Sequence, residues 1–61
     1  MDEFTIEDIP YSPNGRVKGT LRITDNTNGN MRWKEWKAWP DGYNDREQVI
    51  EMLTDYLRQI R

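Results

Sequence analysis

The dipeptide Asn28-Gly29 constrains the fold of this chain more than any other pair of residues. A two-residue type I′ turn needs positive φ at both central positions, and Asn-Gly adopts that conformation readily. The surrounding stretch, residues 16–39, is typical of one long β-hairpin, and it carries six of the nine basic residues and all three tryptophans. The pairing of this hairpin therefore decides which side chains share a face.

With Asn28-Gly29 as the turn, Thr27 pairs with Asn30 and the rest of the register follows. The pairs are then Arg22 with Glu35, Leu21 with Trp36, Gly19 with Ala38 and Thr24 with Trp33. One face becomes largely apolar, with Val17, Leu21, Ile23, Trp36 and Ala38, and the other holds Lys18, Thr20, Arg22, Trp33, Glu35, Lys37 and Trp39. Opposite charges across a strand pair are stabilising, so Arg22 and Glu35 favour this register.

A longer loop within residues 26–30 is the alternative. A slip of one residue would exchange the two faces of the second strand. Trp33 and Trp39 would then turn inward, and Trp36 would face out with Arg32 and Lys34. We favour the two-residue turn and keep the slipped register open.

The amino-terminal segment predicts a third strand. Phe4 and Ile6 alternate with polar residues, and Pro10 ends this strand or confines it to a sheet edge. Residues 12–15, Ser-Pro-Asn-Gly, have the composition of a turn. The expected sheet is an antiparallel meander of strands at about residues 3–9, 16–25 and 31–39.

The carboxyl-terminal third predicts an amphipathic helix over about residues 45–60, after a break at residues 40–43. Asn44 is the expected N-cap, with Glu47 completing a capping box. The sheet and the helix each have one apolar face, and they have only each other to cover it. We therefore predict a single α+β domain over residues 1–61, a three-stranded antiparallel β-meander packed on one C-terminal helix. The expected core contains Phe4, Ile6, Val17, Leu21, Ile23 and Trp36 from the sheet, and Val49, Leu53, Tyr56, Leu57 and Ile60 from the helix.

Composition argues against several classes of function. The chain has no cysteine and no histidine, so we expect no metal site, no cofactor and no enzyme activity. The acidic residues near the start, Asp2, Glu3, Glu7 and Asp8, match no metal-binding loop. No apolar run is long enough to span a bilayer and the acidic start is unlike a signal peptide, so we expect a cytoplasmic protein without membrane contact.

Charge and aromatic residues together suggest what the uncovered sheet face does. Net charge is −2, yet residues 16–37 hold six bases and two acids. Cations that neutralise phosphates, beside rings that stack on bases, suit nucleic acid. The expected contact residues are Lys18, Arg22, Trp33, Lys37 and Trp39.

Two alternatives stay open. The bases can instead pair with the acids of the same chain. The exposed tryptophans and arginines can also anchor a protein partner, as in a phage- or plasmid-type inhibitor of a host enzyme.

A family resemblance supports nucleic-acid binding. The strand GTLRIT, the turn NTNGN, the strand MRWKEWKAW and the helix start GYNDREQV resemble the AP2-like amino-terminal arm-binding domains of phage-type integrases. The resemblance covers about residues 16–60. In that family the exposed sheet face reads the DNA major groove, which implies contacts from Arg22, Lys37 and the outward tryptophans. The expected function is that of a small DNA-binding accessory domain.

Overall fold

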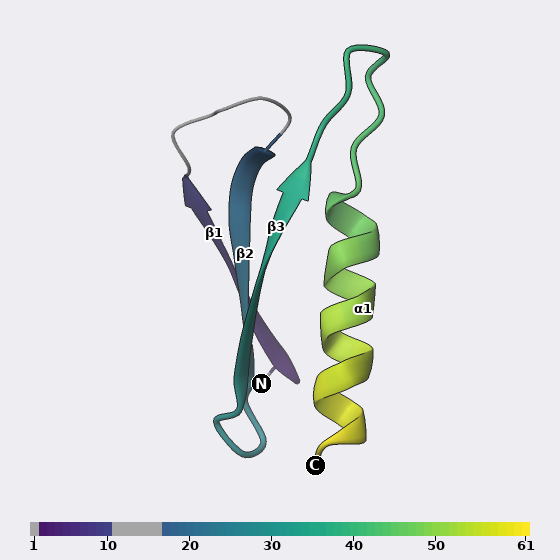
Figure 1. Cartoon of the computed structure of the whole chain (residues 1–61). Coiled ribbons are helices and arrows are strands. Elements are labelled where there is room, and N and C mark those ends of the chain that lie inside the picture. The colour runs from purple at the N-terminus through teal and green to yellow at the C-terminus, as the bar shows by residue number, and fades with distance from the viewer. Residues whose placement is uncertain (1, 11–16) are drawn as a thin grey trace.

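The computed structural model describes residues 2–10 and 17–61, which form one sheet and one helix (Figure 1). The elements are β1 (Phe4–Pro10), β2 (Val17–Asp25), β3 (Met31–Lys37) and α1 (Arg46–Gln59). The three strands form an antiparallel meander in the order β1-β2-β3. The predicted α+β fold is confirmed. The predicted turn at residues 12–15 and the predicted strand start at Arg16 lie outside the described residues.

The β2–β3 connection is a four-residue loop, residues 26–29, so the predicted two-residue turn is wrong. The Asp25 N–H donates to the Asn30 carbonyl at 2.7 Å, and Gly29 N–H donates to the Asp25 carbonyl at 2.8 Å. Two side chains favour the longer loop: the Asp25 carboxylate accepts the Thr27 N–H and the Asn28 side-chain oxygen accepts the Asn30 N–H, both at 2.9 Å. In the described chain, positive φ occurs at Gly29 and Gly42 and at no non-glycine residue, so Asn28 does not adopt the type I′ conformation.

The longer loop moves the pairing by two residues. The observed pairs include Arg22 with Trp33, Thr20 with Glu35, Leu21 with Lys34, Gly19 with Trp36 and Thr24 with Met31. The predicted pairs, Arg22 with Glu35 among them, are therefore wrong. Because the side-chain period of a strand is two, a slip of two residues keeps the side chains of residues 19–24 and 31–36 on their expected faces. Trp36 faces α1 and Trp33 faces away from it, as predicted.

A β-bulge changes the start of β2. The register shifts between Val17 and Gly19, so Val17 lies opposite Lys37. Val17 is half-buried and is not among the residues that pack on the core, contrary to prediction. Gly19 lets the Trp36 indole lie close to the backbone, since an added Cβ would sit 2.9 Å from the indole nitrogen.

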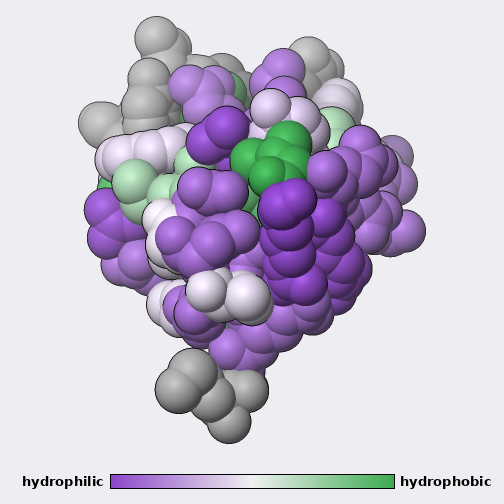
Figure 2. All heavy atoms as spheres, turned by 90° about the horizontal axis from the view of Figure 1, so that it is seen from below, coloured by the Kyte–Doolittle hydropathy of each residue, from purple (hydrophilic) through white to green (hydrophobic). Residues whose placement is uncertain are grey.

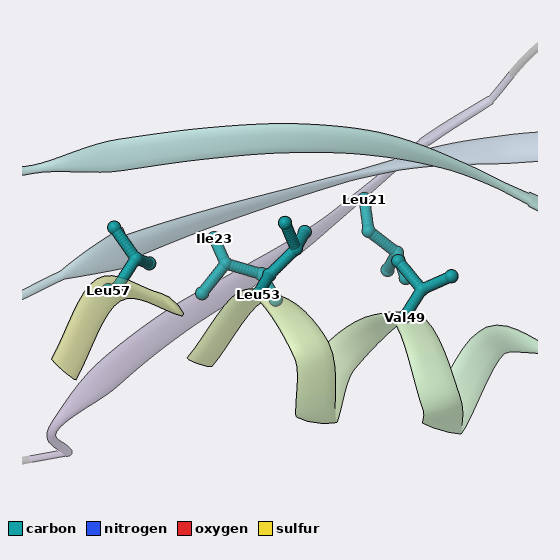
Figure 3. Close-up of a cluster of buried hydrophobic side chains, with 5 residues drawn as sticks. All are labelled: Leu21, Ile23, Val49, Leu53 and Leu57. Atoms are coloured by element: carbon teal, nitrogen blue, oxygen red, sulfur yellow. The ribbon is translucent and has the colours of Figure 1, made fainter. Parts of the chain in front are cut away.

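The core lies between β2 and α1 (Figure 3). Its buried residues are Leu21 and Ile23 from β2, and Val49, Leu53 and Leu57 from α1. Phe4, Trp36 and Ile50 pack against this cluster and are partly buried.

The core contains fewer residues than predicted. Ile6, Tyr56 and Ile60 were expected inside, but they are exposed by 42%, 44% and 36%. Because α1 packs chiefly on β2 and β3, it leaves Ile6 of β1 exposed, and the Tyr56 ring lies against the Arg32 guanidinium instead of in the core.

Helix α1 begins differently from the prediction. Its N-cap is Asp45, not Asn44, and the Asp45 side chain forms no capping hydrogen bond. The Asp45 carboxylate instead accepts the Lys37 N–H at 2.6 Å, while Asp45 N–H donates to the Lys37 carbonyl at 3.1 Å. Asn44 accepts the Arg46 N–H at 3.2 Å. These contacts tie the helix start to the end of β3, which stops at Lys37 and not at Trp39.

Candidate binding surface

Three side chains form a row across the open face of the sheet, the face opposite α1. Glu7 of β1 pairs with Arg22 of β2, and Arg22 pairs with Trp33 of β3. The Arg22 guanidinium donates two hydrogen bonds to the Glu7 carboxylate, at 3.0 and 2.5 Å. It also lies 5.5 Å from the centroid of the Trp33 ring. Hydrogen bonds from Arg22 hold the pKa of Glu7 below its ordinary value.

This row changes the chemistry expected of the open face. Glu7 neutralises Arg22, so Arg22 is poorly placed to neutralise a phosphate as well. Trp33 remains 56% exposed, but the guanidinium covers part of its ring. Glu35 adds a negative charge to the same face of β3 that carries Lys37. The open face is therefore more aromatic than basic.

The other expected contact residues lie toward one end of the sheet. Lys18 is exposed at the bulge of β2 and borders a hollow of about 360 Å³ with Trp36 and Arg46, so it lies on the helix side and not on the open face as predicted. Lys37 is exposed opposite Val17. Trp39 lies beyond β3, is half-buried, and packs against Tyr43 at a centroid distance of 5.2 Å. The structure thus brings Arg22 and Trp33 together, whereas Lys18 lies on the helix side, Lys37 lies opposite Val17, and Trp39 belongs to the β3–α1 connection.

The remaining paired arginines come from α1 and the end of the chain. Arg46 contacts Asp8 at 2.6 Å, and Arg58 contacts Glu3 at 2.9 Å. Arg61 contacts both Glu3 and Asp25 at 2.8 Å. Glu3, Glu7 and Asp8 thus pair with arginines, but among the described basic residues of 17–37 only Arg22 makes such a pair, so the alternative in which the basic stretch pairs with acids of the chain holds for Arg22 alone. Figure 2, seen from the end that holds the carboxyl terminus, shows a mostly hydrophilic surface with one compact hydrophobic spot.

Asp25 is the one fully buried charged residue in the described ranges, 2–10 and 17–61. The Arg61 guanidinium donates hydrogen bonds to its carboxylate at 2.8 and 3.2 Å, and Thr27 N–H donates a third. These donors, Arg61 above all, lower the pKa of Asp25 from 3.8 to about 2 despite its burial. No buried side-chain nitrogen or oxygen in the described chain lacks a hydrogen-bond partner, so this carboxylate is a satisfied structural group.

The cations of β3 differ from the paired arginines. Within residues 2–10 and 17–61, Arg32, Lys34 and Lys37 make no ion pair. Arg32 and Lys34 lie on the α1 side of the strand: the Arg32 guanidinium is 5.3 Å from the centroid of the Tyr56 ring, and Lys34 borders a hollow of about 190 Å³ with Val49 and Met52.

Exposed apolar side chains lie on both sides of β3. Met31 and Trp33 are exposed on the open face, and Met52 and Tyr56 are exposed on the helix side. Sequence reasoning did not assign Met31, Met52 and Tyr56 to a surface. Tyr56 sits at the margin of the apolar stripe of the helix, and that marginal position is the signal that could have identified it.

Comparison with known proteins returns no match. No family model, no curated protein and no solved structure matches this chain. The resemblance to the arm-binding domains of integrases therefore stays a prediction. No helix in the described part of the chain is both long and apolar enough to cross a membrane. Residues 2–10 and 17–61 also hold no cluster of carboxylates that could bind a metal ion.

Proposed function

We propose that this protein is a small protein-binding module whose interface is centred on β3. The observation that carries the proposal is that exposed apolar side chains flank β3 on both of its faces. Met31 and Trp33 are exposed on the open face, and Met52 and Tyr56 are exposed on the helix side. Tryptophan, tyrosine and arginine dominate the energetics of protein interfaces, and methionine adapts to irregular partner surfaces. An inhibitor or adaptor of another protein would use such a surface.

The residues have distinct roles in this proposal. Trp33 is the central anchor, and the Arg22 guanidinium, itself paired with Glu7, lies against its ring. Met31 extends the apolar contact on the open face. Arg32 and Lys34 supply charge that steers an acidic partner toward the strand.

Nucleic-acid binding is the second candidate, and the unpaired cations of β3 beside Trp33 favour it. We rank it lower because Glu7 neutralises Arg22 and because Glu35 lies on the open face. DNA or RNA binding also needs several phosphate contacts from one surface, whereas the β3 cations divide between two faces.

A position-specific photo-crosslink distinguishes the two candidates. The photoreactive residue p-benzoylphenylalanine replaces Met31 in one variant and Glu51 in a control, because Glu51 is exposed on the far side of α1. In the native host we expect an adduct from position 31 that protease destroys and nuclease leaves intact, and none from position 51. Trp33→Ala in the position-31 variant should weaken adduct formation about tenfold, as loss of an interface anchor does.

Two results would contradict the proposal. A nuclease-sensitive adduct from position 31 would establish the nucleic-acid candidate in its place. Equal protein adducts from positions 31 and 51 would show that β3 is not the interface.

A further inference from the structure

The outer edge of β3 offers unpaired backbone groups. Asp25 N–H bonds to the Asn30 carbonyl, and hydrogen-bonded pairs alternate along an antiparallel ladder. Arg32, Lys34 and Trp36 therefore direct their N–H and C=O groups toward β2. Trp33 and Glu35 direct theirs outward.

The end of this edge is already occupied. Lys37 also points its backbone groups outward, and Asp45 takes both of them. The Arg32 side chain donates to the Met31 carbonyl at 2.7 Å. The outward backbone groups that stay open are therefore those of Trp33 and Glu35, and every residue from 31 to 35 is exposed.

Proteins normally protect an exposed strand edge, and β3 has only part of that protection. It contains no proline, and the bulge of this strand pair lies in β2, away from residues 31–35. On the helix side of the edge, a hollow of about 190 Å³ lies between Lys34 and the α1 residues Val49 and Met52. The protection that is present is positive charge, from Arg32 and Lys34.

This charge opposes self-association. If two copies paired antiparallel through β3 with Trp33 at the centre, Arg32 of each copy would face Lys34 of the other. If the pair were centred on Lys34, the two Lys34 side chains would face each other. Like charges directly opposite destabilise strand pairs, so a second copy is a poor occupant.

The other edge of the sheet suits a partner less well. Strand β1 ends in Pro10, which has no N–H to donate. Its acids Glu7 and Asp8 are already paired with Arg22 and Arg46. Only β3 combines outward backbone groups with unpaired charge.

From these observations we infer that β3 binds an extended acidic segment of a partner protein, which adds to the sheet as a fourth strand. This inference rests on the proposed protein-binding function and names its mode. Main-chain hydrogen bonds to Trp33 and Glu35 supply affinity, as in other cases of strand addition. Side chains on the helix side of the segment are acidic and face Arg32 and Lys34, while those on the open side are apolar and lie against Met31 and Trp33.

The test uses a short capped peptide in which glutamates alternate with valines, titrated into the labelled protein. Two N-methylated versions carry methyl groups on alternate sets of amides, so that only one set would face β3. We expect the unmodified peptide to bind and to protect the Trp33 and Glu35 amides from exchange. We expect one methylated peptide to lose binding and the other to keep it within about twofold.

Matched protein variants separate the edge from general charge attraction. Lys34→Glu should weaken peptide binding about tenfold, whereas Lys18→Glu, the same change in net charge on β2 and outside residues 31–35, should alter it less than about twofold. Glu35→Pro removes one outward N–H. Because proline is tolerated in an edge strand, this variant should stay folded and should lose peptide binding.

The outcomes distinguish this inference from the proposed function. Equal sensitivity to both methylation patterns, or no binding of the acidic peptide, would overturn strand addition. A protein adduct from position 31 would leave the protein-binding function standing in that case. Absence of that adduct would contradict both the protein-binding function and strand addition.

Discussion

At the scale of single residues, the long-range ion pairs are the part of the structure that could not be predicted from the sequence. Asp25 ends β2 and reads as an ordinary loop acid, yet it is fully buried against Arg61, thirty-six residues further along the chain. Glu7 and Arg22 likewise meet only because β1 and β2 align in one particular register. Composition suggested that bases and acids of this chain pair, but partner identity depends on tertiary geometry.

The buried Asp25 carboxylate gives a pH prediction. Its folded-state pKa, about 2, lies below its ordinary value of 3.8, so its ionised form stabilises the fold above that ordinary value. This stability should be lost as pH falls from about 4 through about 2, because the unfolded chain takes up the proton first. Glu3 and Glu7, whose pKa values arginines also lower, should add to the same loss.

Urea unfolding at several pH values measures this loss directly. Asp25→Asn should reduce the dependence of the unfolding free energy on pH in this range, since the neutral amide cannot titrate. An unchanged dependence would show that Asp25 is not linked to Arg61 in solution.

At the scale of elements, hydrophobic periodicity predicted all four elements. The observed bounds of β1 and α1 each differ from the expected ones by one residue, β2 ends at Asp25 as expected, and β3 ends two residues early. The loop length was predicted wrongly because Asn28-Gly29 is typical of a two-residue turn. Hydrogen bonds to the side chains of Asp25 and Asn28 stabilise the four-residue loop instead. From Gly19 onward the faces were still right, since the error in register was an even number of residues, but the bulge at the start of β2 changed the faces of Val17 and Lys18.

The central contact of α1 gives a stability prediction. Leu53 is 7% exposed in the middle of the core, so Leu53→Ala should lower the free energy of unfolding by about 2–4 kcal/mol. Met52→Ala is the matched control, because its side chain is 47% exposed on the neighbouring position. Urea midpoints that fell equally in both variants would mean that α1 packs through a different face.

At the scale of the whole molecule, charge separates the two edges of the sheet. Acids of the β1 region are paired with arginines from β2 and from α1, and the bases of β3 keep no carboxylate partner among the described residues. The sequence predicted the sheet face on which Trp33 and Lys37 lie. It could not tell that Arg22 is neutralised, because that depends on the register of β1, nor that Arg32 and Lys34 line an open strand edge.

Residue-resolved amide hydrogen exchange of the free protein tests the accessibility of this edge most directly. The amides of Arg32 and Lys34, which bond to β2, should exchange slowly, and those of Trp33 and Glu35 should exchange fast. Lys37 should be protected as well, through its bond to Asp45. The reverse pattern, with Trp33 and Glu35 slow and Arg32 and Lys34 fast, would mean a register slipped by one residue. The two faces of β3 would then be exchanged, and the surface proposed here would not exist.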